Sequence, residues 1–151
     1  MIDGLLALVA PHHCSGCHEI GTLLCDNCKY DISSEWSERC IQCLAPSPTG
    51  ICSHHRAAYK KAWFVGERKD TLQHLIGGLK FQNTKAAAKH LADLLNDHLP
   101  DLPADTIIIP IPTAASHIRE RGYDHMLLIA QHLAQKRNLQ MDNRLLIRKN
   151  V

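Results

Sequence analysis

The chain has 151 residues, of which 45% are hydrophobic, 5% are aromatic and 21% are charged. This composition is typical of a globular protein, so neither a disordered chain nor a coiled coil is the default expectation. The few aromatic residues weaken any interpretation built on base stacking. The formal net charge of +2 does not indicate nucleic-acid binding, and it would become slightly negative if the seven cysteines bound zinc as thiolates.

The first eleven residues contain a short apolar run at positions 5–10. No basic segment precedes this run, and it is too short to cross a bilayer, so we expect a short helix rather than a signal peptide or an anchor. Closely paired cysteines without a secretion signal indicate metal binding in a reducing compartment rather than disulfides. We therefore predict a cytoplasmic protein with no membrane partner.

Four ligand pairs, each with two residues between its members, define the N-terminal part of the chain. They are Cys14 and Cys17, Cys25 and Cys28, Cys40 and Cys43, and Cys52 and His55. A tight turn with this spacing directs two donors at one ion, and zinc accepts sulfur and nitrogen alike. Four pairs supply ligands for two tetrahedral zinc ions, which are the predicted cofactors. Disulfide-bonded or buried free cysteines and an iron–sulfur cluster are alternatives that the regular spacing disfavours.

The pairs can combine in two ways. A sequential scheme joins neighbouring pairs through loops of 7 and 8 residues, whose closure costs little entropy. A cross-braced scheme interleaves the pairs, and we prefer the sequential one. His54 is an alternative to His55 as the last ligand. Because protein fills every coordination position, the predicted role of the metal is structural rather than catalytic.

The composition changes near residue 57, after the last cysteine. We predict a double zinc-ribbon module with a short N-terminal helix at residues 1–57 and an α/β domain at residues 58–151. The second part should begin with a strand at 62–65. Asp70 or Thr71 should cap a helix whose apolar residues have helical spacing, and Asn83 or Thr84 should cap another that ends before Pro100.

The predicted elements continue with a strand at 106–109, whose β-branched residues suggest burial on both faces. A helix from about Gly122 should bury Met126, Ile129, Ala130 and Leu133, and a last strand should follow at 145–147. No internal repeat is visible. Arg119 and Arg121 are expected on a loop between strand and helix, beside a helix N-terminus, where phosphate binds in many α/β proteins. Solvated surface charges are the alternative.

Several motifs together resemble those of the ComF family. These are the paired cysteines, the sequence LKF at 79–81, IPIP at 109–112 and RERGYDH at 119–125. ComF proteins are competence-associated and combine a double zinc ribbon with a type I phosphoribosyltransferase domain. The resemblance covers nearly the whole chain in matching order. It implies an α/β fold in which a small N-terminal double zinc ribbon precedes the N-terminal part of a phosphoribosyltransferase-like parallel sheet.

The resemblance also implies a site and partners. Lys80, Arg119 and Arg121 would face the pyrophosphate side of a phosphoribosyl pyrophosphate pocket, although a solvated helix-end charge is an alternative role for Lys80. The implied partners are single-stranded DNA, taken up during competence, and a helicase-like competence protein. Family members typically have RGFNQ at 121–125, so Asp124 and His125 depart from that pattern.

The chain also departs from the family pattern because two motifs of type I phosphoribosyltransferases are missing. Type I phosphoribosyltransferases carry a late strand with two acidic residues and a Thr-Thr-Gly loop, and neither occurs here. We therefore expect a chain that lacks the catalytic half, with no catalytic residue, and with Mg²⁺ relevant only to a full-length form. The missing strands would leave 107–109 near an exposed sheet edge. A zinc-ribbon adaptor that docks a protein or nucleic acid without catalysis, and a purine-salvage type of enzyme, are the alternative functions.

Overall fold

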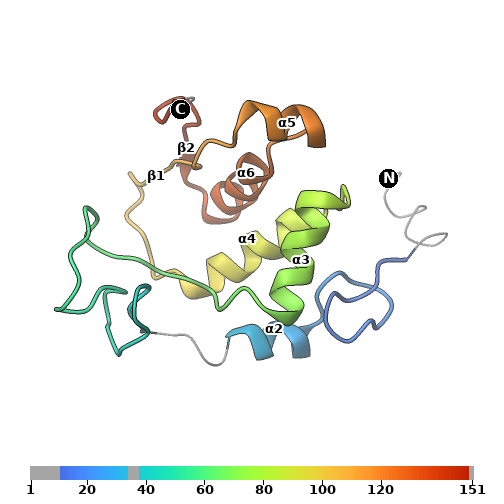
Figure 1. Ribbon diagram of the computed structural model, residues 1–151, viewed down its shortest axis with the longest axis horizontal. Coiled ribbons are helices and arrows are strands. Elements are labelled where there is room, and N and C mark those ends of the chain that lie inside the picture. Colours follow the sequence, from blue (N-terminus) through green and yellow to red (C-terminus); the bar gives the residue numbers. More distant parts are fainter. Residues whose placement is uncertain (1–10, 34–37, 150–151) are drawn as a thin grey trace.

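The computed structural model describes residues 11–33 and 38–149, so the short helix predicted at 5–10 lies outside the described residues. A cysteine-rich segment is followed by a mostly helical body with a small parallel sheet (Figure 1). The described elements are α2 (Asp26–Ser33), α3 (Asp70–Phe81), α4 (Ala87–His98), β1 (Ile107–Ile108), α5 (Ala115–Arg121), α6 (His125–Arg137) and β2 (Gln140–Met141). Within these ranges, no helix is both long and apolar enough to cross a membrane.

The two helices predicted from apolar spacing after residue 70 are confirmed as α3 and α4. Each buries one face, with Leu75 of α3 and Leu94 of α4 fully covered. The predicted caps are wrong. The residues at the N-cap positions are Lys69 and Ala86, and neither makes a side-chain capping hydrogen bond. Packing of the apolar faces therefore decides where these helices form, as is usual for helices of about 12 residues.

The main hydrophobic core joins these helices to the first cysteine cluster. Its buried members are Cys14, Leu23, Leu24, Cys28, Leu72, Leu75, Leu79, Ala87, Ala88, Leu91, Leu94 and Tyr123. The core thus includes residues on both sides of position 57, and the domain boundary expected there stays a prediction. Because two cysteines belong to this core, the geometry of the first cluster is coupled to the packing of the helices.

Helix α4 lies between α3 and α6 and contacts both (Figure 1). The predicted helix after Gly122 is confirmed as α6, in which Ala130 and Leu133 are buried. Arg137, at the end of α6, binds the C-terminal end of α4. Its guanidinium donates to the carbonyl oxygens of Asn96, Leu99 and Pro100 and to the side-chain oxygen of Asn96, over 2.6–2.8 Å.

The sheet is smaller than expected. β1 pairs with β2 in parallel, Ile107 opposite Gln140 and Ile108 opposite Met141. The predicted strand at 106–109 is therefore confirmed in place, but Ile107 is 45% exposed, so it is not covered on both faces. The strands predicted at 62–65 and 145–147 are wrong, and both segments are irregular. Apolar runs form strands only where a second strand is available to pair with them.

Candidate metal centres and anion site

The structure gathers the predicted metal ligands into two groups of four. Cys14, Cys17, Cys25 and Cys28 form the first tetrad, and Cys40, Cys43, Cys52 and His55 form the second. Within each tetrad the ligand atoms all lie within 4.8 Å of one another. This is the sequential grouping, and the histidine that takes part is His55 rather than His54.

The ligand separations fit a metal ion. The Sγ atoms of Cys14 and Cys25 are 3.7 Å apart, as are those of Cys43 and Cys52. A tetrahedron with metal–sulfur bonds of about 2.3 Å has edges of about 3.8 Å. The Nδ1 atom of His55 lies 3.5 Å from Cys40 Sγ, so this nitrogen is the donor that faces the second tetrad. Each tetrad can hold a metal ion such as zinc.

The first pair of cysteines in each tetrad is presented by the same backbone structure, a repeat that the sequence does not show. The two segments are residues 12–21 and residues 38–47. In the first, the amide of Cys14 donates to the carbonyl of Glu19, and in the second, the amide of Cys40 donates to the carbonyl of Ala45, each over 2.8 Å. The residue after each pair, His18 or Leu44, has a left-handed backbone with φ of 63° or 61°. We call these two segments the first and second knuckle.

The first cysteine of each knuckle favours the thiolate, whereas burial and neighbouring thiols raise the pKa of the second, Cys17 or Cys43, although a backbone N–H opposes the rise. Burial opposes ionisation of Cys14, but backbone N–H groups that include that of Cys25 outweigh it and lower the pKa of Cys14 to about 6. The N–H of Cys52 is the main cause that lowers the pKa of Cys40 to about 6. Burial and the neighbouring thiols raise the pKa of Cys28 to about 12. Four thiolates thus repel one another without a cation, and a divalent ion removes this repulsion.

The two tetrads have different surroundings. The first knuckle packs on the start of α3, where a Cβ added to Gly16 would lie 2.5 Å from Thr71 Oγ1, and the His74 ring lies 3.2 Å from the carbonyl of Ser15. The second knuckle lies outside the main core. Gly50, just after this knuckle, packs so closely on the carbonyl of Ala62 that a side chain at position 50 would overlap it. The first tetrad therefore supports the helices, and the second supports the segment that follows it.

The predicted anion-binding residues are only partly brought together. Lys80, at the end of α3, is near Arg121 of α5 and near Arg68, which the sequence analysis missed. Burial is the main cause that lowers the pKa of Lys80, followed by the charges of Arg68 and Arg121. The guanidinium of Arg121 lies over the Phe81 ring, 5.6 Å from its centre. We call Arg68, Lys80 and Arg121 the cationic cluster.

Arg119 does not share this surface. Residues 115–121 form the short helix α5 rather than the expected loop, and residues two apart on a helix point in different directions. Arg119 is exposed, whereas Arg121 is half-buried. Helix α5 escaped the sequence analysis because none of its residues is buried, so no apolar spacing marks it.

The N-terminus of α6, expected to receive an anion, is capped by the chain itself. Oδ1 of Asp124 accepts from the amides of Met126 and Leu127 over 2.9 and 3.3 Å, and from the Thr113 hydroxyl over 2.7 Å. These amides are the donors that a phosphate would otherwise use. The cationic side chains, and not the helix end, are therefore the part of this region that can bind an anion.

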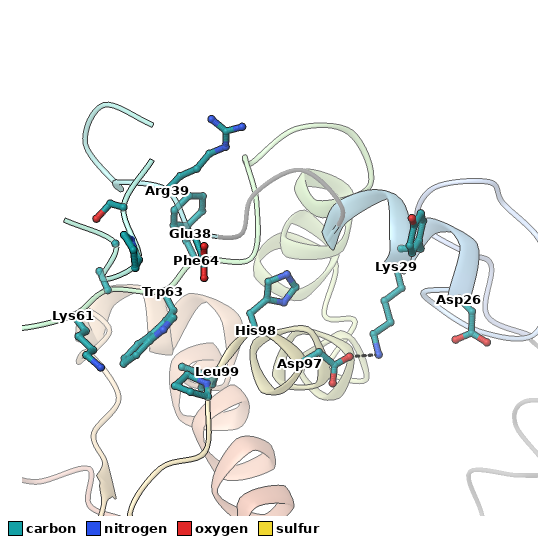
Figure 2. Close-up of a pocket in the computed structure, with 16 residues that line it drawn as sticks. Asp26, Lys29, Glu38, Arg39, Lys61, Trp63, Phe64, Asp97, His98 and Leu99 are labelled. Carbon is teal, nitrogen blue, oxygen red and sulfur yellow. Dashed lines mark ion pairs between the residues drawn. The ribbon is translucent and has the colours of Figure 1, made fainter. Parts of the chain in front are cut away.

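A cleft of about 810 Å³ lies between the second knuckle and the helices (Figure 2). Trp63 and Phe64 line it from the segment after the second tetrad, and His98 lines it from the end of α4. Lys29 of α2 forms an ion pair with Asp97 of α4 at 2.5 Å along its wall. Apolar rings and charges of both signs thus meet in one concave surface.

Comparison with models of known families, with curated proteins and with solved structures found no match for this chain. The resemblance to the ComF family therefore depends on the motifs and their order.

Proposed function

We propose that this chain is a ComF-like, zinc-stabilised protein whose cationic cluster binds phosphate groups. The ligand would be phosphoribosyl pyrophosphate or the backbone of single-stranded DNA, which share the same phosphate chemistry. The two tetrads would each hold one zinc ion with a structural role.

One observation carries this proposal. The LKF and RERGYDH motifs, forty residues apart in the sequence, are in contact through Leu79 and Tyr123, and each contributes a residue to the cationic cluster. None of the ion pairs within the described ranges involves Arg68, Lys80 or Arg121. Cations held close together without a carboxylate repel one another, and a bound anion relieves that repulsion. Arg121 also presents a planar guanidinium, which matches phosphate oxygens in pairs.

Binding of phosphoribosyl pyrophosphate to the zinc-loaded chain, measured by calorimetry, tests the first ligand. The double variant Lys80→Ala/Arg121→Ala should bind at least about tenfold more weakly, because a hydrogen bond to a charged group contributes about 1.5–3 kcal/mol. Arg119→Ala removes one positive charge outside the cluster and should change the affinity much less. Unchanged binding by the double variant would contradict the proposed site.

Single-stranded DNA is tested by fluorescence anisotropy with a labelled oligonucleotide. The affinity should fall steeply with salt because phosphate contacts release counterions. The affinity should also drop in the variant Arg119→Ala/Arg121→Ala, since it removes two positive charges from the last turn of α5. If that variant binds DNA as well as the parent does, this surface is not the DNA contact.

The second candidate function, an adaptor that docks a protein partner, is favoured by the cleft in Figure 2. Trp63 is 39% exposed beside charged residues, and aromatic residues within a polar rim are typical of protein interfaces. Binding of a helicase-like competence protein should weaken in Trp63→Ala but persist in Lys80→Ala/Arg121→Ala. The opposite pattern would exclude docking at this cleft.

A further inference from the structure

His125 is a buried polar residue at the edge of the cationic cluster. It is the first residue of α6 and only 8% exposed. Its Nδ1 atom lies 3.2 Å from an Nη atom of Arg121. Since a guanidinium has only donors, Nδ1 must accept this hydrogen bond, so the ring is neutral in the structure.

The charges that face His125 come from three elements. Lys80 is on α3, Arg121 and His117 are on α5, and Asp124 precedes α6. Oδ1 of Asp124 accepts from two amides of α6 and from the hydroxyl of Thr113. Burial, followed by Lys80 and Arg121, lowers the pKa of His125, and Asp124 opposes this only in part. The ring therefore lacks its second proton at neutral pH while no anion is bound.

We infer that His125 is a further ligand-binding group of the anion site, and that it takes up a proton from solvent when a multiply charged anion binds to Lys80 and Arg121. This inference rests on the proposed function. The anion offsets the two charges that keep the ring neutral. The protonated Nδ1 can then donate to the anion instead of accepting from Arg121, and Arg121 keeps its place over Phe81. The site thus selects ligands with two or more negative charges.

Binding and protonation must favour each other to the same extent, because the coupling between two sites is reciprocal. Sulfate is a suitable probe, since it remains a dianion throughout the range in which histidine titrates. Sulfate should bind the zinc-loaded chain more tightly at about pH 6 than at about pH 8. The difference between these two pH values is about three- to fivefold if the pKa of His125 rises by about one unit on binding. The calorimetric heat should also depend on the ionisation enthalpy of the buffer, which reports the proton.

His125→Gln is the matched variant, because its amide oxygen can accept from Arg121 but cannot titrate. This variant should lose the tightening of sulfate binding between about pH 8 and about pH 6. His117→Gln removes the exposed histidine on α5 and should keep the tightening. In the unsubstituted chain, NMR titration should show a higher His125 pKa with sulfate than without it, which tests the inference even if the variant folds poorly.

The outcomes separate the two proposals. If sulfate binds to the cluster without proton uptake, or if His125→Gln keeps the full pH dependence, this inference is overturned and the proposed anion site stands. If sulfate does not bind, or binds equally well to Lys80→Ala/Arg121→Ala, the proposed site itself fails.

Discussion

The hydroxyl of Tyr123 donates a hydrogen bond to the main-chain carbonyl of Leu79. Both residues are buried, and the bond joins the RERGYDH motif to the last turn of α3, just before Lys80. The final carbonyls of a helix have no partner within it, so this hydroxyl satisfies one of them. The same bond fixes Lys80 relative to Arg121, which makes it the structural basis of the cationic cluster.

Tyr123→Phe keeps the ring and removes only the hydroxyl. We expect a loss of about 1–2 kcal/mol in the free energy of unfolding, because a buried carbonyl is left unsatisfied. Urea denaturation of the zinc-loaded chain measures this loss in the free energy of unfolding. Tyr30→Phe is the control, since Tyr30 is 72% exposed and its hydroxyl should contribute less than about 0.5 kcal/mol. Equal losses in the two variants would contradict the role given to the Tyr123 hydroxyl.

Asp124 caps α6, and the cap depends on an acceptor oxygen rather than on charge. Asp124→Ala should therefore cost about 1 kcal/mol of stability, whereas Asp124→Asn should cost almost nothing. Thermal unfolding of the two variants side by side measures this difference. If Asn proves as damaging as Ala, the carboxylate acts through its charge and not as a cap.

Arg137, at the end of α6, donates four hydrogen bonds to the C-terminal end of α4 and the residues that follow it. We expect Arg137→Ala to lower the free energy of unfolding by about 2 kcal/mol, and Arg137→Lys to recover only part of it, because an ammonium cannot reproduce the planar fork. The neighbouring Lys136 forms a surface ion pair with Asp93 at 2.5 Å. Lys136→Ala should cost less than about 1 kcal/mol, and a larger effect there than at Arg137 would be the contrary result.

The two tetrads should differ in what they stabilise. Cys14 and Cys40 occupy matching positions in the two knuckles, and both are fully buried, but only Cys14 belongs to the main core. Cys14→Ala should therefore unfold the helical body, since structural zinc contributes on the order of 10 kcal/mol in small modules. Cys40→Ala should leave the helical content measured by circular dichroism nearly unchanged. Equal losses of helix in both variants would show that the tetrads are not separate in this way.

The parts of the structure predicted best are those fixed by local spacing. Pairs such as Cys14 and Cys17 determine which ligands can meet one ion, and the apolar spacing of Leu72, Leu75 and Leu79 determines the buried face of α3. The tetrads and the three longer helices followed from such patterns. Whether zinc occupies the tetrads, and what the cationic cluster binds, stay predictions.

The rest depends on contacts between distant segments, which no local pattern records. Arg68 precedes α3 and Lys80 is in its last turn, so no local spacing predicts that the charge of Arg68 acts on Lys80. The repeat of the two knuckles is carried by backbone hydrogen bonds, and its left-handed positions hold His18 and Leu44 instead of the glycine that favours that conformation. The strand expected at 145–147 failed because β1 pairs with Gln140 and Met141 instead.

The zinc-binding role of the two tetrads is tested by the number of zinc ions bound per chain, measured by native mass spectrometry on protein purified from zinc-replete cells. We expect two ions in the parent and one in the double variant Cys43→Ser/Cys52→Ser, because both substitutions fall in the second tetrad. Cross-braced sites would lose both ions in that variant. A parent chain that carries no metal, yet remains folded in a strong chelator, would show that the two tetrads do not stabilise the fold by binding zinc.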